Sequence, residues 1–155
     1  LRAIGASIAR LDEPNDLALL KFNEPVKLKL PEQLFGDADA LTPGTPVMHL
    51  GYPFGNTGAQ VVLMRSGFLA AKVEVEQQIK RLYVEGVAYS GAAGGPLIDA
   101  ARGNIIGVIN SQLGLLPKPK AAGNEFKLPI MTDLSFAAPV NALTRLLESE
   151  LDASS

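Results

Sequence analysis

The sequence predicts an all-β protein, a barrel or a sandwich, with one helix at its C-terminal end. Short apolar runs separated by turn residues dominate the 155 residues, which is typical of antiparallel β proteins. The 15 glycines and 11 prolines are too many for a helical bundle. Apolar residues recur at three- and four-residue spacing only in residues 140–151, and this spacing predicts an amphipathic helix.

The N-terminal third predicts three strands. Residues 4–11 alternate weakly, residues 17–22 form a continuous apolar run, and residues 25–30 alternate cleanly. Glu13-Pro14-Asn15-Asp16 has the composition of a turn between the first two strands. Periodicity alone also allows a helix over 17–22, with Asp16 as its N-cap.

Further strands are predicted over residues 47–50, 61–64, 67–75, 82–85 and 105–110. The turn at residues 51–55 follows the first of these strands, and a glycine-rich segment at 91–96 precedes the last. Residues 114–133 have no clear periodicity and contain three prolines. Loops of this length tend to be functional or disordered.

Composition and charge exclude several classes of protein. The 14 basic and 16 acidic residues give a net charge of −2, so neither a nucleic-acid-binding surface nor attraction to anionic lipid is expected. No apolar run approaches the roughly 18 residues of a membrane span. Because the chain has no cysteine and its acidic residues form no paired site, no metal site and no cofactor are predicted.

The strongest signal for chemistry is the segment Ser90-Gly91-Ala92-Ala93-Gly94-Gly95-Pro96-Leu97. A glycine-rich turn between two strands can direct backbone N–H groups into one hollow, where they bind a negatively charged oxygen. A tight connection without function is the alternative for this segment alone.

This segment resembles the nucleophile loop of trypsin-like serine proteases, with alanine in place of the serine. Other segments resemble the bacterial Deg/Htr-like branch of that family, in the right order: Asn15 to Lys21, Gly51 to Gly55, Gly103 to Asn110 and Phe136 to Asn141. The resemblance covers nearly the whole chain. It implies two antiparallel β-barrels of the trypsin-like type, the first lacking its opening strands, with a C-terminal α-helix. The expected division is 1–57 for the remainder of the first barrel and 58–155 for the second.

The resemblance also implies the roles of individual residues. Asp16 corresponds to the aspartate that orients the catalytic histidine, and Ala93 stands at the nucleophile position. The backbone N–H groups of Gly91 and Ala93 correspond to the oxyanion hole. Without a hydroxyl at position 93 we expect an inactive chain, and the intact flanking motif favours an engineered Ser-to-Ala form. A natural pseudoprotease that binds peptides or proteins is the alternative.

The substrate pocket is implied by the same comparison. The residues expected to form its walls are Val87, Ala88, Tyr89, Asn110, Ser111 and Gln112. Valine at position 87 places no carboxylate at the base of the pocket, and a buried cation without a partner is costly. We therefore expect a serine endopeptidase domain that prefers a small or apolar residue before the scissile bond of a polypeptide substrate.

The catalytic histidine of the family has no counterpart here. The single histidine, His49, stands on a predicted strand, where a structural role is expected. We therefore expect a companion chain or a docked fragment that carries the missing N-terminal strands and the catalytic histidine, because a barrel without its first strands exposes an open edge and an apolar face.

Overall fold

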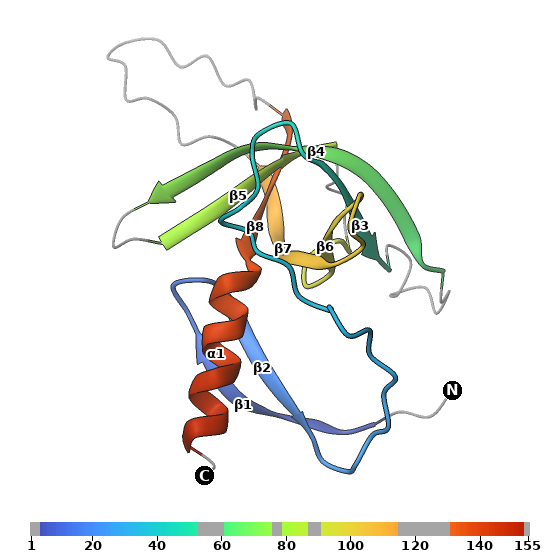
Figure 1. Ribbon diagram of the computed structural model, residues 1–155, viewed down its shortest axis with the longest axis vertical. Coiled ribbons are helices and arrows are strands. Elements are labelled where there is room, and N and C mark those ends of the chain that lie inside the picture. Colours follow the sequence, from blue (N-terminus) through green and yellow to red (C-terminus); the bar gives the residue numbers. More distant parts are fainter. Residues whose placement is uncertain (1–3, 53–60, 76–78, 87–90, 115–130, 154–155) are drawn as a thin grey trace.

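The computed structural model describes residues 4–52, 61–75, 79–86, 91–114 and 131–153. In this part of the chain, six strands form a closed barrel, two form a separate sheet, and one helix packs beside that sheet (Figure 1). The elements are β1 (Ala6–Asp12), β2 (Leu17–Phe22), β3 (Pro46–Gly51), β4 (Leu63–Val75), β5 (Ile79–Glu85), β6 (Pro96–Asp99), β7 (Ile105–Gly114), β8 (Met131–Pro139) and α1 (Val140–Ala153).

The closed barrel has the strand order β3-β4-β5-β8-β7-β6, and every neighbouring pair in it is antiparallel. Closure leaves this sheet without a free edge. Its interior is mostly apolar, because the inward faces of the strands supply aliphatic side chains. The fully buried ones include Val47, Leu69, Leu82, Val84, Leu97, Ile106 and Ile109.

The second sheet consists of β1 and β2 alone, which pair antiparallel with a bulge between Ile8 and Arg10. One face of this sheet packs on α1. The contacting apolar residues are Leu17 and Leu19 of the sheet together with Ala142, Leu143 and Leu146 of the helix. The other face carries exposed apolar side chains, namely Ile8, Leu11, Leu20 and Phe22.

Helix α1 follows β8 directly and lies along the two-stranded sheet (Figure 1). Val140, Ala142 and Leu146 are its buried residues, which confirms the predicted amphipathic helix. At its first turn, Asn141 binds a preceding loop: its Oδ1 accepts a hydrogen bond from the Ala38 N–H, and its Nδ2 donates one to Asp37 Oδ1. No helix in the described residues has the length and apolar character that crossing a bilayer requires.

The predicted fold class is confirmed in its coarser form: the chain is mostly β, with a barrel, a second sheet and one C-terminal helix. The strand prediction for residues 25–30 is wrong. Leu28 and Leu30 are exposed there, and this stretch pairs with none of the described strands. Alternation predicts a strand only where a second strand supplies hydrogen bonds, and a single sequence does not contain that information.

Two strands were missing from the prediction. β6 has only four residues, and β8 lacks alternation because it is covered on both sides, by the barrel core and by α1. The expected division after residue 57 also differs from the sheet topology. That division would place residues 46–51 in the first barrel, whereas β3 pairs with β4 and β6 and closes the six-stranded barrel.

Candidate functional site

Asp16 stands at the end of the tight turn between β1 and β2. Its φ of 53° lies in the left-handed region, which aspartate tolerates better than most residues. The turn is closed by the Asp16 N–H, which donates to the Glu13 carbonyl over 3.1 Å. Asp12 holds it from within, because its carboxylate accepts from the backbone N–H and the side-chain Nδ2 of Asn15. The carboxylate of Asp16 is therefore carried on a fixed turn and remains exposed.

The barrel reaches this turn through Asn110 of β7. Asn110 Nδ2 lies 3.1 Å from the Asn15 carbonyl oxygen, 3.2 Å from the Asp16 carbonyl oxygen and 3.3 Å from Asp16 Oδ2. One buried amide group thus contacts both the backbone and the carboxylate of the turn. A hydrogen bond to a carboxylate fixes the orientation of that carboxylate.

A bulge in β7 accompanies this contact. Ile109 pairs with Ala137 and Ser111 pairs with Phe136, so the register with β8 shifts across Asn110. A bulge bends a strand and re-aims the side chain at that position. The amide of Asn110 is buried and directed at the β1–β2 turn, although Asn110 was predicted as a wall of the substrate pocket.

The glycine-rich loop lies beside the same point of β7. The Gly94 N–H donates to the Ile109 carbonyl over 2.7 Å, and the Ile109 N–H donates to the Gly95 carbonyl over 3.0 Å. Ile109 precedes Asn110, so two consecutive residues of one strand hold the loop and the Asp16 turn. The structure therefore brings together Asp16, Asn110 and residues 91–95, which the sequence separates by up to 94 positions.

The loop itself has the backbone conformation that its glycines allow. Gly91 and Gly94 have φ values of 92° and 81°, which side chains disfavour. Ala92 is buried in the barrel core, whereas Ala93 is exposed at the loop surface. Within the described residues, the N–H groups of Gly91 and Ala93 donate no hydrogen bond, while those of Gly94 and Gly95 do. The amides without a hydrogen bond in this part of the chain, those of Gly91 and Ala93, are the predicted oxyanion donors.

Part of the predicted pocket lies outside the described residues. This holds for Val87, Ala88 and Tyr89. Ser111 and Gln112 are on β7, where they pair with Phe136 and Ser135 of β8.

His49 lies in the interior of the barrel, fully buried on β3. Its Nδ1 is 3.1 Å from the Pro96 carbonyl oxygen. Burial lowers the pKa of His49, and the hydrogen bond to Pro96 only partly opposes that shift, so the ring is neutral near pH 7. His49 is the only histidine of the chain. Its Nδ1 hydrogen bond is to Pro96 inside the barrel and not to Asp16.

Sequence reasoning missed Arg81 of β5. Its guanidinium donates from Nη2 to the Pro14 carbonyl and from Nη1 to Asn15 Oδ1, 3.3 Å away. The turn that carries Asp16 is thereby held from two strands of the barrel, by Asn110 on β7 and Arg81 on β5. No motif marks Arg81, because its role depends on how the two sheets pack.

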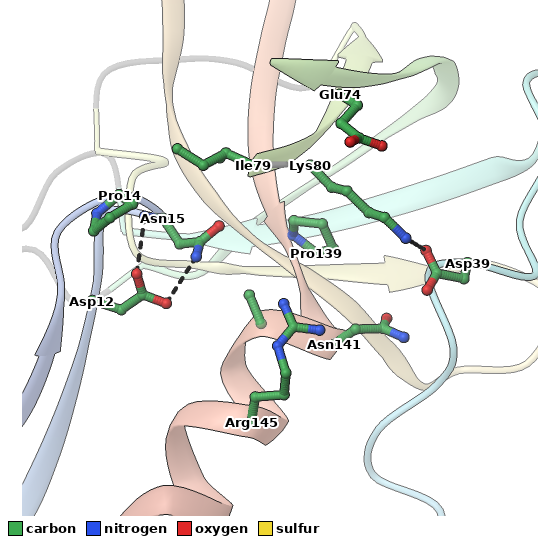
Figure 2. A pocket seen from close by; sticks show the side chains of 11 residues that line it. Asp12, Pro14, Asn15, Asp39, Glu74, Ile79, Lys80, Pro139, Asn141 and Arg145 are labelled. Atoms are coloured by element: carbon green, nitrogen blue, oxygen red, sulfur yellow. Dashed lines mark hydrogen bonds and ion pairs between the residues drawn. The ribbon is translucent and has the colours of Figure 1, made fainter. Parts of the chain in front are cut away.

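A cavity of about 660 Å³ lies between this turn, the start of β5 and the first turns of α1 (Figure 2). Asp12 and Asn15 bound it on one side, Lys80 paired with Asp39 on another, and Arg145 rises from the helix. Among the residues that the structure describes, none of the sequence-predicted site residues lines this cavity. Its lining includes Pro14 and Asn15 of the turn that carries Asp16, and no described residue of the glycine-rich loop.

Metal ligands are not grouped in the part of the chain that the structure describes: no cluster of three or more His, Cys, Asp or Glu residues has suitable geometry. The chemistry of the assembled residues is that of a carboxylate held near a loop of backbone amides.

Comparisons with known proteins identify similar sequences and folds. Residues 2–108 match the family model described as "Trypsin-like peptidase domain". The chain is 32% identical over 133 residues to the magnetosome formation protease MamE of Magnetospirillum gryphiswaldense, an alignment that covers 79% of this chain and 15% of that protein.

Solved structures of the HtrA-type protease AlgW have the same fold. With a decapeptide bound, AlgW matches with a TM-score of 0.66 at 23% identity, over 95% of this chain and 40% of AlgW. With a tripeptide bound, it matches with a TM-score of 0.64 at 24% identity, over 97% of this chain and 44% of AlgW. The chain thus spans less than half the length of these relatives.

Proposed function

The chain belongs to the trypsin-like peptidase family, and we propose that it is most of a serine endopeptidase domain of the HtrA type, present in an inactive form. The observation that carries the proposal is the adjacency of two contacts on β7. Asn110 binds the Asp16 carboxylate, and Ile109 binds Gly94 and Gly95 of the glycine-rich loop.

The proposed reaction is hydrolysis of a peptide bond through an acyl-enzyme. In an active form, a serine at position 93, where this chain has alanine, would attack the scissile carbonyl. A histidine would take the hydroxyl proton and later give it to the leaving amine. Asp16 would hold that histidine in the required tautomer and stabilise its charged form. Asn110 fixes the direction of the carboxylate, since its amide binds Oδ2 and the backbone of the same turn.

Negative charge that develops on the carbonyl oxygen needs preorganised donors. The N–H groups of Gly91 and Ala93 have no partner among the described residues, and this supports their assignment as the oxyanion hole. The neighbouring amides of Gly94 and Gly95 are used to close the loop. Gly94 and Gly95 thus hold the turn, while the N–H groups of Gly91 and Ala93 are available to stabilise an oxyanion.

Inactivity follows from two features of the sequence. Ala93 has no hydroxyl, so no acyl-enzyme can form at this position. The chain's only histidine lies within the barrel beside Pro96. Because loss of a triad member leaves the oxyanion hole intact, a small residual rate over water is compatible with this proposal.

The missing histidine would come from a companion chain or a docked fragment. The exposed face of the two-stranded sheet supports this: Ile8, Leu11, Leu20 and Phe22 are between 48% and 63% exposed on one side of β1 and β2. Further strands that close over this face, as in a barrel, would bury these side chains. In this arrangement residues before β3 belong to the first barrel, and β3 to β8 form the second.

The substrate preference rests on the pocket that the family resemblance implies, formed by Val87, Ala88, Tyr89, Asn110, Ser111 and Gln112. Val87 offers no charge to a basic side chain, so a small or apolar residue should precede the scissile bond. AlgW, a relative in fold, is known with bound peptides, which is consistent with a polypeptide substrate here.

A natural pseudoprotease that binds peptides in the same cleft is the second candidate. One experiment separates the two functions. The chain with Ala93→Ser is combined with a polypeptide that supplies the preceding strands and their histidine, and the folded complex is treated with a fluorophosphonate probe. The unsubstituted chain in the same complex serves as the control.

Covalent labelling at position 93, absent from the control, is the result expected for the protease. A folded complex that binds peptides but is not labelled would instead establish the binding module. Mass spectrometry of the labelled peptide identifies the residue in either case.

A further inference from the structure

Among the described residues, His49 is the largest polar side chain buried inside the barrel, and it lies against the glycine-rich loop. It stands on β3 opposite Leu97 of β6 and is 0% exposed. Gly95 immediately precedes β6, so the end of the loop lies next to the imidazole of His49. Buried polar groups in such a place are retained at a cost in desolvation.

The contact between His49 and the loop is close. A Cβ atom built on Gly95 would lie 2.4 Å from His49 Cε1 and 2.3 Å from the Leu50 carbonyl oxygen. His49 Nδ1 is also 3.1 Å from the Pro96 carbonyl oxygen. A carbonyl oxygen only accepts hydrogen bonds, so Nδ1 carries the proton and donates it.

We propose that His49 is a positioning residue for the glycine-rich loop, which it holds from inside the barrel. The other side of the loop is held by Ile109, which accepts from Gly94 and donates to Gly95. The Gly95 N–H closes the turn on the Ala92 carbonyl over 3.1 Å. With Gly95–Pro96 fixed between β3 and β7, the turn has one arrangement, and the amides of Gly91 and Ala93 remain available.

This inference deepens the proposed function, because it names what keeps the oxyanion donors in place. It assigns no proton transfer to His49. A side chain that positions a site through packing and one hydrogen bond should affect the order of the loop before it affects the rest of the barrel.

The test is amide hydrogen exchange, measured by NMR on the chain as it exists, with two matched variants. His49→Asn keeps an N–H donor close to the position of Nδ1, and His49→Leu keeps an apolar volume without a donor. The reporters are the N–H groups of Gly94, Gly95 and Ile109. Leu69, whose N–H donates to the Thr45 carbonyl, reports on the remainder of the barrel.

We expect His49→Leu to lose roughly tenfold more protection at the three loop reporters than at Leu69, and His49→Asn to retain most of it. Equal losses at the loop and at Leu69 would overturn the inference, because His49 would then support only global stability. Equal losses in both variants would overturn the role of the hydrogen bond.

A second measurement needs no substitution. The ¹⁵N shifts of the His49 ring in the unmodified chain report which nitrogen carries the proton, and Nδ1–H is the expected tautomer. Finding the Nε2–H tautomer would contradict the hydrogen bond to Pro96. Both measurements concern the loop itself, so they stand or fall separately from labelling at position 93.

Discussion

Asn110 Nδ2 lies 3.3 Å from Asp16 Oδ2, across 94 positions of the sequence. This contact joins the closed barrel to the turn between β1 and β2. It is reinforced by hydrogen bonds from the same amide to the carbonyl oxygens of Asn15 and Asp16. The orientation of the Asp16 carboxylate therefore depends on a residue of β7, the strand whose Ile109 holds the glycine-rich loop.

Removing the amide of Asn110 should loosen the turn. Asn110→Ala is expected to lower the free energy of unfolding by about 1–2 kcal/mol, because a buried donor with three acceptors is lost. Asn110→Asp should cost more, because it places a second carboxylate at a buried position against that of Asp16. Urea denaturation measures both effects. Equal losses in the two variants would contradict a direct contact between residue 110 and the Asp16 carboxylate.

Gly95 should not tolerate a methyl group. In Gly95→Ala, the new Cβ meets the Leu50 carbonyl oxygen at 2.3 Å, so the backbone of β3 or of the loop has to move. We expect a loss of more than about 2 kcal/mol in denaturant unfolding. Gly103→Ala is the control: its φ is 75° and a Cβ would meet no atom within 4 Å, so only left-handed strain of about 1 kcal/mol is expected. Similar losses in both variants would argue against close packing at Gly95.

Because of His49, the free energy of unfolding should fall as the pH is lowered below about 6.5. Burial lowers its folded-state pKa below the ordinary value of 6.5, so the unfolded chain binds the proton first. The free energy of unfolding therefore falls as the pH drops from 6.5 toward the folded-state pKa, by at most roughly 1.4 kcal/mol per pH unit. Urea unfolding at pH 7.5, 6.5 and 5.5 measures this slope.

His49→Asn is the matched variant for that measurement, since it removes the only histidine of the chain. Its unfolding free energy should be flat between pH 7.5 and 5.5. A slope that persists in the variant would assign the dependence to carboxyl groups instead.

Arg81 should affect the β1–β2 turn more than the barrel. In Arg81→Ala, the turn loses hydrogen bonds to the Pro14 carbonyl and to Asn15 Oδ1. Exchange of the Asp16 amide hydrogen should become severalfold faster, while that of Leu69 should change little. Lys80→Ala is the comparison variant, because its pair with Asp39 is exposed and such pairs contribute about 0–1 kcal/mol. Equal exchange at Asp16 in the two variants would remove Arg81 from the support of the turn.

Most of the fold could be predicted from local patterns. The run at 17–22 and the helical spacing from residue 140 correspond to β2 and α1 because each element buries one apolar surface. The alternation at 25–30 failed because no strand in the described residues pairs with it. β6 and β8 escaped prediction, since a strand of four residues and a strand covered on both sides give no period-2 signal.

The candidate site was predictable only in part. The glycine-rich motif and the Asn15–Asp16 segment indicate the loop and the carboxylate through a family resemblance. The contact of Asn110 with Asp16 depends on a bulge in β7. The hydrogen bonds of Arg81 to the β1–β2 turn depend on the packing of the two sheets. Both are relations between distant segments, which the residues at either end do not encode by themselves.

The central claim is that Asp16 and the glycine-rich loop form one catalytic site. The most direct test uses the complex of the Ala93→Ser chain with a polypeptide that supplies the preceding strands and their histidine. The hydrolysis rate of a chromogenic peptide is measured for this complex with Asp16→Asn, with Asp39→Asn, and with neither substitution. We predict that Asp16→Asn lowers kcat by about 10³–10⁴-fold, whereas Asp39→Asn, at an exposed ion pair with Lys80, leaves it within about twofold. Equal kcat values in the two variants would contradict the claim.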